Sequence, residues 1–339
     1  MKAMILAAGF GNRLWPLTQD RAKPAIPFLG RPLIAHSVEL LKHAGITDIT
    51  VNLHYQGESI KKALGDGSRF GVNLDYSEEA EILGTAGGID KVREKFLDDD
   101  FVVINGKIVT DVDLQSAIRA HRERQAIATL VLKENVARER FSIIEVDERN
   151  YISRFAGFPQ AVATAADSQS GATSPVEPAP LMFVSIHILS PRIFNYIPRH
   201  GFSDTVMDVY PAAMRAAEAV IGHIATGHWY EFSTLTRYLE LSLALLHKDG
   251  KHMVQGANCQ IADSARVSDS ILWDNVTVEA GARVQQAVLA EGVRIPAGAH
   301  IERAVVVRRE IINRGVEERQ RLEIANIEEA GENIIVHLK

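Results

Sequence analysis

The sequence predicts an α/β protein with a mostly parallel sheet, followed by a short β-helix. Two observations lead to this expectation. In the first part of the chain, short apolar runs alternate with segments of helical spacing, which is typical of a parallel sheet. A later region repeats itself at a fixed interval. Because 339 residues exceed one usual hydrophobic core, two domains are expected.

The elements of the sheet are expected in order along a first domain of residues 1–250. Buried strands are predicted at residues 3–6, 49–53, 101–104, 127–132 and 181–189. Helices are predicted from about residue 32 to 43, with Gly45 beyond the end, and over 238–247. Loops after neighbouring parallel strands meet at one edge of the sheet, so ligand-binding residues are expected there.

The chain then repeats with a period of 17 residues. The three units begin at Ile261, Val278 and Ile295. Within each unit the first apolar positions lie six residues apart, which is the hexapeptide pattern of a β-helix with three short strands per coil. We therefore expect β-helix repeats over 256–311, followed by a C-terminal tail over 312–339 to which no chemistry is assigned.

Composition and charge exclude several classes of function. The chain has 46% hydrophobic and 24% charged residues, as an ordinary globular protein does, and its net charge of −6 argues against a nucleic-acid surface. No stretch is long and apolar enough to span a bilayer, and a single cysteine, Cys259, fits a reducing compartment. We expect a cytoplasmic protein with no nucleic-acid or membrane partner.

Residues 161–180 contain no run of apolar residues that could build a core. This segment is therefore predicted to be a mobile surface loop.

A glycine-rich loop directly follows the first predicted strand. Gly9 and Gly11 allow a sharp turn that presents backbone N–H groups to an anion, and Arg13 and Lys23 follow as two cations suited to phosphate. A dinucleotide fingerprint would need a glycine where this chain has Leu14, and a P-loop would need Gly-Lys-Ser/Thr. The pattern favours a phosphate site of another kind over a plain strand-to-helix turn.

A second glycine-rich segment, at 79–89, predicts contact with a nucleotide base. Gly84 lets the backbone approach the base, Thr85 can donate a hydrogen bond, and Glu79 or Glu81 can accept one from an amino group. The structural alternative is a helix that begins near Thr85, with the glycines as its entry turn. The pattern leaves the identity of the base open.

Both motifs, with Lys23-Pro24 and the repeat, resemble the sugar-1-phosphate nucleotidyltransferases, especially those like mannose-1-phosphate guanylyltransferase. The resemblance covers nearly the whole chain and implies a Rossmann-like nucleotidyltransferase domain with a left-handed β-helix. It implies that an NTP and a sugar 1-phosphate give an NDP-sugar and pyrophosphate, assisted by Mg²⁺, with Arg13 and Lys23 as catalytic cations. The nucleotide-binding residues it implies are Leu6, Ala8, Gly9, Gly11, Asn12, Glu79, Gly84, Thr85, Ala86 and Gly106.

Four positions depart from the pattern that the resemblance implies. Lys107 stands where the family has a metal-binding aspartate, and an ammonium group cannot coordinate Mg²⁺. Glu231 replaces the second metal-binding aspartate and would be the ligand of any Mg²⁺ that binds. In the sugar-phosphate region, Ser142 replaces a glycine and Phe158 replaces the lysine that anchors the sugar phosphate.

Three functions stay open from the sequence. The first is synthesis of an NDP-sugar with altered metal and sugar-phosphate sites. The second is a weak or inactive relative that binds a nucleotide or NDP-sugar as a regulatory subunit, because the changes spare the nucleotide-facing motifs. The third and weakest is a hexapeptide acyltransferase with His300 as its base. We expect the β-helix to dock on the first domain, or to mediate homo-oligomerisation or contact with a partner subunit.

Overall fold

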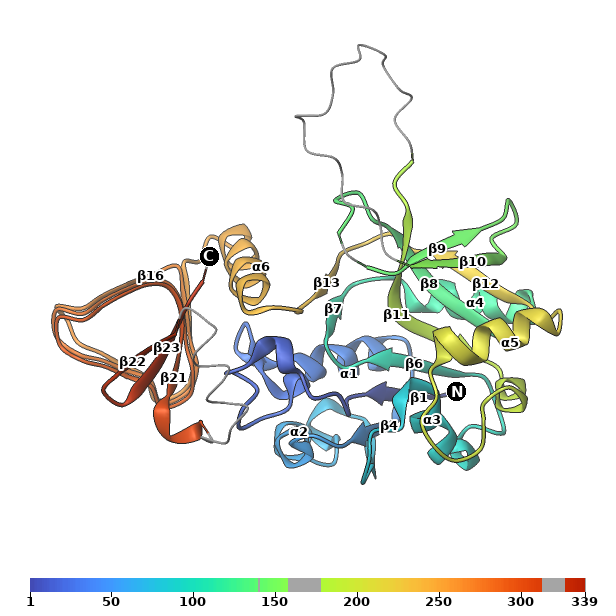
Figure 1. Ribbon diagram of the computed structural model, residues 1–339, viewed down its shortest axis with the longest axis horizontal. Helices are drawn as coiled ribbons and strands as arrows, with labels where there is room; N and C mark the ends of the chain where they lie inside the picture. The colour runs from blue at the N-terminus through green and yellow to red at the C-terminus, as the bar shows by residue number, and fades with distance from the viewer. Residues whose placement is uncertain (140, 158–177, 313–326, 339) are drawn as a thin grey trace, which may run out of the picture.

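The computed structural model describes residues 1–139, 141–157, 178–312 and 327–338. An α/β part and a β-helix lie at opposite ends of the molecule (Figure 1). The predicted loop at 161–180 falls outside the described residues except at its last three positions, and Phe158 falls outside them as well. The predicted α/β class and the hexapeptide β-helix are both confirmed.

The α/β part is built on one mixed sheet with strand order β10-β9-β11-β6-β1-β4-β5, to which β8 and β12 are joined through β11. The four parallel strands at its centre and edge are β1 (Lys2–Leu6), β4 (Asp48–Leu53), β5 (Asn73–Glu78) and β6 (Phe101–Asn105). The remaining strands are β8 (Ala128–Glu134), β9 (Ile143–Val146), β10 (Ile152–Gly157), β11 (Leu181–Leu189) and β12 (Val220–Ile224). Every predicted strand is present within two residues of its expected bounds.

One face of this sheet is covered by α1 (Leu33–His43), α2 (Gly57–Leu64) and α4 (Leu114–Glu123), and the other by α3 (Gly84–Lys91) and α5 (Tyr210–Arg215). Helix α6 (Leu235–Lys248) packs instead against the β-helix. The prediction for α6 began three residues late, because Thr234 caps the helix: its Oγ1 accepts a hydrogen bond of 3.2 Å from the Arg237 backbone N–H. Short helices of other types carry the label η. They are η1 (Asn12–Leu14), η2 (Lys23–Ala25), η3 (Ser68–Phe70), η4 (Arg93–Lys95), η5 (Pro191–Asn195), η6 (Thr205–Val209) and η7 (Arg309–Ile311).

In the β-helix, each residue pairs with the residue one 17-residue repeat later, in the next coil. Ile261 pairs with Val278 and Val278 with Ile295, so equivalent positions of successive units lie directly above one another. Its parallel strands are β14 (Met253–Gln255), β15 (Gln260–Ile261), β16 (Arg266–Ser268), β17 (Ser270–Leu272), β18 (Thr277–Val278), β19 (Arg283–Leu289), β20 (Arg294–Ile295) and β21 (His300–Arg308).

The C-terminal tail closes the last coil of the β-helix. Its described part forms a hairpin of β22 (Ile327–Ala330) and β23 (Asn333–His337), and β23 pairs antiparallel with β21. Ile334 and Ile335 are buried there. The hairpin therefore covers an edge that would otherwise expose a row of unpaired backbone groups.

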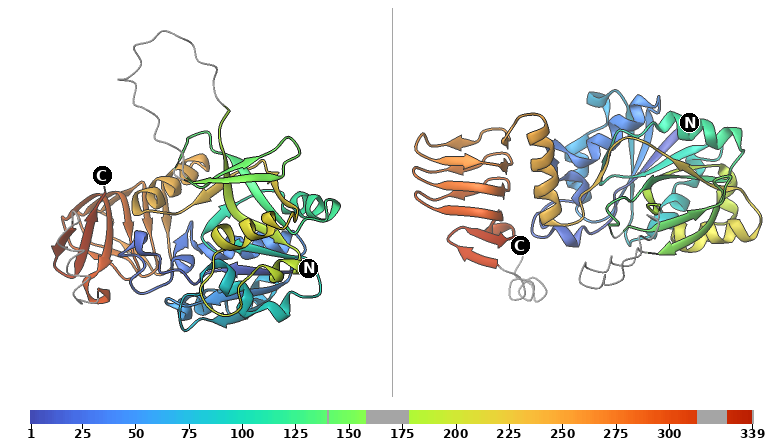
Figure 2. Two further views of the ribbon diagram at one scale, coloured as in Figure 1. Left: turned by 45° about the vertical axis from the view of Figure 1, so that its right-hand side comes forward. Right: turned by 90° about the horizontal axis from the view of Figure 1, so that it is seen from above.

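Helix α6 lies between the β-helix and the α/β part, as the right-hand view of Figure 2 shows. Its apolar face, with Leu239 and Leu243, belongs to one continuous hydrophobic cluster that also contains Leu14 of the α/β part and Trp273 and Val288 of the β-helix. Because these regions share buried apolar surface, separating them would expose it to water. The β-helix is thus packed against the segment that follows the glycine loop.

Candidate functional site

A cleft of about 420 Å³ lies where β1, β4 and β6 end, as expected for a parallel sheet. The structure brings both sequence motifs together in its walls. The predicted residues that line it are Leu6, Ala8, Gly9, Gly11, Asn12, Arg13, Lys23, Glu79, Gly84, Thr85 and Lys107. Ala86 and Gly106 lie behind this lining: Ala86 is buried in α3, and the Gly106 N–H donates to the Leu6 carbonyl at 3.0 Å.

Glycine stands at positions 9 and 11 of the first loop for different reasons. Gly11 has a φ of 70°, and a Cβ at this position would lie 3.0 Å from Cβ of Lys23 and 3.1 Å from Cγ2 of Thr18. Gly9 has open space where a Cβ would stand. The fold itself therefore requires glycine at position 11, whereas Gly9 leaves its backbone open to a ligand.

Lys23 is a buried cation in the wall of this cleft, with 7% of its surface exposed. Burial lowers its pKa to about 7, the positive charges of Lys107 and Arg13 add to this, and Glu231 partly opposes it. A phosphate in the cleft would supply the negative charge that the protein gives Lys23 only in part. The electrostatics of the site therefore favour an anion.

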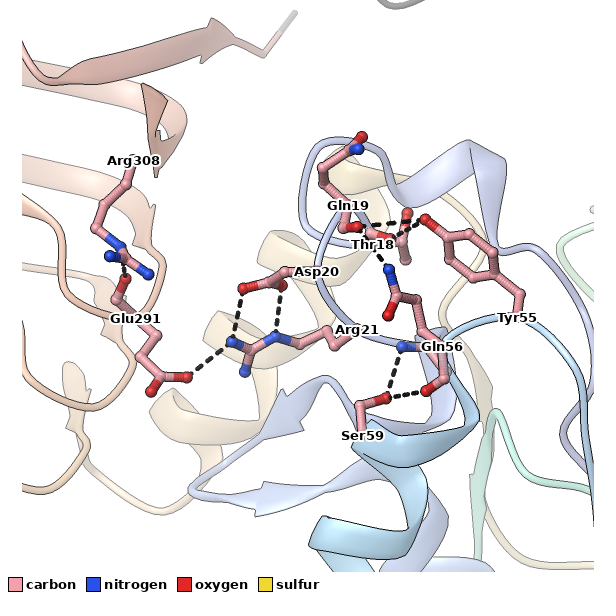
Figure 3. Close-up of polar contacts among 10 residues, drawn as sticks. Thr18, Gln19, Asp20, Arg21, Tyr55, Gln56, Ser59, Glu291 and Arg308 are labelled. Carbon is pink, nitrogen blue, oxygen red and sulfur yellow. Dashed lines mark hydrogen bonds and ion pairs between the residues drawn. The ribbon is translucent and has the colours of Figure 1, made fainter. Parts of the chain in front are cut away.

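The segment between the glycine loop and Lys23 is held by α2 and by the preceding loop (Figure 3). Tyr55 Oη donates to the Thr18 carbonyl at 2.9 Å, and Gln56 Nε2 donates to the Gln19 carbonyl at 3.0 Å. The Ala22 N–H donates to Ser59 Oγ at 2.9 Å.

The same segment is held on its other side by the β-helix (Figure 3). Arg21 donates to both carboxylate oxygens of Asp20 and to Glu291 Oε2, the latter at 2.7 Å. The Arg21 guanidinium also lies over the Trp273 ring, 4.9 Å from its centroid. The β-helix thereby helps to fix the chain that positions Lys23.

Asn52 and Glu79 join the two glycine-rich loops. Asn52 Oδ1 accepts from the Ala7 N–H at 2.7 Å, and Asn52 Nδ2 donates to Glu79 Oε1 at 2.7 Å. Glu79 Oε2 accepts from the Leu83 N–H at 3.1 Å. Both side chains are buried in the wall of the cleft, where Glu79 holds the two loops together. Its contact with a base amino group stays a prediction.

The second glycine-rich segment is the start of α3, which is the structural alternative that the sequence left open. Thr85 Oγ1 donates to Asp204 Oδ2 at 3.0 Å, and a Cβ on Gly84 or Gly87 would strike the backbone carbonyl of Ser203 or Gly201. These glycines therefore allow the loop before η6 to pack against α3. A role of Thr85 toward a base stays a prediction alongside this structural one.

Lys107 and Glu231 form an ion pair beside Lys23. The short strands β7 (Ile108–Thr110) and β13 (Trp229–Glu231) pair antiparallel, which sets Glu231 opposite Ile108. Lys107 Nζ donates to Glu231 Oε1 at 2.6 Å. Burial alone would raise the pKa of Glu231, but Lys107, followed by Lys23 and Arg13, outweighs it and the pKa is lowered. Glu231 is thus a buried carboxylate whose charge is balanced by a lysine.

This arrangement does not fit a Mg²⁺ ion. Mg²⁺ requires oxygen ligands in near-octahedral geometry. The carboxylate predicted as its ligand, Glu231, is bonded instead to the ammonium group of Lys107. An ammonium so close to the expected metal position would repel a divalent cation.

A second cleft, of about 650 Å³, adjoins the first and shares Arg13 and Lys107 with it. Ser142, predicted for the sugar-phosphate region, and Glu231, predicted as a metal ligand, both line it. Its other lining residues are Glu139, Phe141, Phe183, Ser185, Ser233 and Arg237. His300, the base of the acyltransferase alternative, lies outside both clefts on strand β21.

Arg237, which sequence reasoning missed, organises this second cleft. Its Nη1 donates to Glu139 Oε1 at 2.9 Å and its Nε donates to the Glu231 backbone carbonyl at 2.8 Å. Arg237 lies in the first turn of α6. Asn52, Asp204 and Glu139 were missed as well, because none of them belongs to a recognisable motif.

A nucleotidyltransferase-type α/β domain joined to a hexapeptide β-helix is the class that this fold and cleft define. Comparison with known families agrees, since the nucleotidyl transferase family model matches residues 2–248 and the GlmU-like C-terminal hexapeptide model matches residues 251–329. The chain belongs to the nucleotidyl transferase family, and its relatives are sugar-1-phosphate nucleotidyltransferases. Such enzymes generally use a divalent metal.

Three curated relatives illustrate the likeness. A UTP–glucose-1-phosphate uridylyltransferase of Synechocystis is 31% identical over 82% of this chain and 72% of its own. An N-acetylmuramate α-1-phosphate uridylyltransferase of Neisseria meningitidis is 34% identical over 71% of this chain and 96% of its own. A mannose-1-phosphate guanylyltransferase of Mycobacterium tuberculosis is 25% identical over 82% of this chain and 81% of its own.

A solved structure has the same fold. A putative glucose-1-phosphate thymidylyltransferase from Bacillus anthracis, in complex with sucrose, superposes with a TM-score of 0.59 at 23% identity, over 72% of this chain and 94% of its own. None of the described helices is long and apolar enough to cross a membrane.

Proposed function

We propose that this chain binds a nucleoside triphosphate or NDP-sugar in the first cleft without a divalent metal, and that it transfers nucleotidyl groups slowly or not at all. The ion pair between Lys107 and Glu231 carries this proposal. It places the ammonium group of Lys107 beside Arg13 and Lys23, at the junction of the two clefts. Because Glu231 balances the charge of Lys107, the net positive charge that would face the phosphates comes from Arg13 and Lys23.

Binding and turnover depend on this charge in different ways. An ammonium group can neutralise phosphate oxygens, but it cannot hold them in the octahedral arrangement that a metal imposes. Nucleotidyl transfer relies on positioning and on electrostatic stabilisation of the transition state. Replacing the metal by Lys107 should therefore spare ground-state binding more than turnover.

Active synthesis of an NDP-sugar is the second candidate, and the second cleft favours it. This cleft adjoins the first, shares Arg13 with it, and is large enough for a sugar phosphate. In that reaction an oxygen of the sugar 1-phosphate would attack the α-phosphorus of the NTP. The bond to the β-phosphate would break, and Arg13 and Lys23 would stabilise the leaving pyrophosphate.

The test is pyrophosphate release from a panel of NTP and sugar 1-phosphate pairs with Mg²⁺, beside nucleotide binding by calorimetry. The variant Lys107→Asp restores the carboxylate that the family pattern has, and Lys62→Asp, at an exposed position on α2, makes the same charge change away from the clefts. We expect the parent and Lys62→Asp to bind nucleotide with negligible release, and Lys107→Asp to gain Mg²⁺-dependent release. Robust parent turnover that Lys23→Ala abolishes would establish the second candidate instead.

Assembly through the β-helix and a cytoplasmic location are part of this proposal. A regulatory subunit would need a partner, and the β-helix presents a side away from α6 (Figure 2). Sedimentation of the purified chain, alone and with a nucleotidyltransferase from the same cell, would test the first of these expectations. The sugar and the base are left to the substrate panel.

A further inference from the structure

Two histidines and an aspartate converge at the joint between α6 and the β-helix. His247 lies in the last turn of α6, His252 directly precedes β14, and Asp269 lies between β16 and β17. None of the three lines either of the two clefts. The nucleotide-binding proposal assigns them no role.

The three side chains meet at one carboxylate oxygen. His247 Nε2 lies 2.8 Å and His252 Nδ1 lies 2.9 Å from Asp269 Oδ1. The three atoms all lie within 4.8 Å of one another.

The β-helix backbone does not require an aspartate at this corner. Asp269, Gln286 and Arg303 occupy equivalent positions of successive coils, and all three have a positive φ, of 46°, 49° and 44°. Since glutamine and arginine serve in the same conformation, the geometry of the corner does not explain the carboxylate. His252 stands one repeat before Asp269 and lies next to it.

From this geometry we propose that His247, His252 and Asp269 bind a transition-metal ion such as Zn²⁺, with solvent at the remaining position. Imidazole nitrogen and carboxylate oxygen are zinc ligands at about 2.0 to 2.2 Å, which separates ligand atoms around a tetrahedral ion by about 3.3 Å. The two nitrogens need to move a few tenths of an ångström away from Asp269. Exposed side chains can do so, and His252 is 71% exposed.

A metal here would join the end of α6 to the first coils of the β-helix. His247 comes from α6, whereas His252 and Asp269 come from two stacked coils. The ion would therefore stabilise the folded arrangement by mass action. Protons compete with metal for imidazole nitrogen, so binding should weaken at acid pH.

The experiment titrates the metal-free full-length protein with Zn²⁺ in competition with a chromophoric chelator, and with Co²⁺ followed by visible absorption. The variants are His252→Ala and Asp269→Asn. The matched control is His300→Ala, which removes an exposed histidine of the same β-helix outside the cluster. Melting temperatures without metal establish that each variant is folded.

We expect one equivalent of Zn²⁺ to bind the parent and His300→Ala, with at least about a 100-fold loss of affinity in His252→Ala and Asp269→Asn. Zn²⁺ should raise the melting temperature of the parent and of His300→Ala but not of His252→Ala, and the tetrahedral Co²⁺ absorption should disappear with His252. Equal Zn²⁺ binding by parent and His252→Ala, or no binding by the parent, would overturn the proposal and leave the three residues as an ion-paired cluster.

Discussion

The two joined clefts differ in what their charged groups face. In the first, Lys23 forms no ion pair with a carboxylate of the described residues, and burial, followed by the positive charge of Lys107, lowers its pKa. In the second, Lys107 is paired with Glu231 and Arg237 with Glu139. The Lys23 side of the first cleft thus favours an anion, whereas Lys107 and Arg237 are balanced by carboxylates; Arg13 lines both clefts. The proposal therefore separates nucleotide binding, which would depend on Lys23, from transfer chemistry, which would depend on Lys107 and Glu231.

The largest expected effect comes from removing the unbalanced cation. Lys23→Ala should weaken nucleotide binding by about 10- to 100-fold, since a charge-assisted hydrogen bond contributes about 1.5 to 3 kcal/mol. Ser142→Gly, in the second cleft, should change the affinity less than about threefold, the scatter of neutral surface changes. Calorimetric titration measures both. Similar losses in the two variants would remove the distinction between the clefts.

The titration of Lys23 offers a pH test of the same distinction. Its pKa is lowered from 10.5 to about 7, so the unfolded chain binds this proton more tightly between those values. Below about pH 7, charged Lys23 lowers the free energy of unfolding by its full amount. As the pH rises from about 7 toward 10.5, this destabilisation disappears.

At pH 8 Lys23 is mostly neutral, and a bound phosphate should draw a proton back onto it. We expect nucleotide binding at that pH to take up close to one proton. Calorimetry in two buffers of different ionisation enthalpy measures this uptake. Lys23→Met is the control, because uptake that persists in this variant would place the titrating group elsewhere.

A smaller effect is expected for the ion pair of the second cleft. Lys107→Met leaves the buried Glu231 without its partner and should lower the free energy of unfolding, whereas adding Glu231→Gln should recover much of the loss. A coupling of about 1 to 2 kcal/mol is expected for a pair that is partly buried. Urea unfolding of the parent, both single variants and the double variant provides the cycle. Strict additivity would mean that the two side chains do not act as a pair.

The smallest effect concerns the support that the β-helix gives to the first cleft. Arg21→Ala removes the contacts with Glu291 and Trp273, so the segment before Lys23 loses one of its two attachments. Nucleotide affinity should fall about threefold, the effect of a positioning contact worth about 0.6 kcal/mol. Arg294→Ala is the matched control, because it breaks an arginine–glutamate pair within the β-helix. An equal loss in both variants would indicate a general weakening of the β-helix.

The sequence predicted those features that depend on local spacing. The glycine loop, the helix that follows it and the 17-residue repeat could be predicted because each depends on a pattern of residues close together in the sequence. The ion pair was not, since Lys107 and Glu231 lie 124 positions apart and meet only through the pairing of β7 with β13. Asn52 had a usable signal, a polar residue within an apolar strand. Asp204 had none, because its role depends on a loop that folds back onto α3.

The repeat and the tail show the same difference between local patterns, which can be predicted from sequence, and long-range pairing, which cannot. Registers such as Val278 with Ile295 follow directly from the period. The hairpin at the C-terminal end does not belong to the period, and no strand was predicted in the tail that forms it. Its antiparallel pairing with β21 could be settled only in three dimensions.

The central claim, that Lys107 takes the place of a metal, is tested most directly by nucleotide affinity in Mg²⁺ and in EDTA. For the parent, we expect binding in EDTA to be as tight as in Mg²⁺ or tighter, because Arg13 and Lys23 supply the positive charge and Lys107 already balances Glu231. For Lys107→Asp, binding should depend on Mg²⁺. Loss of parent binding in EDTA, together with rapid Mg²⁺-dependent turnover, would contradict the account.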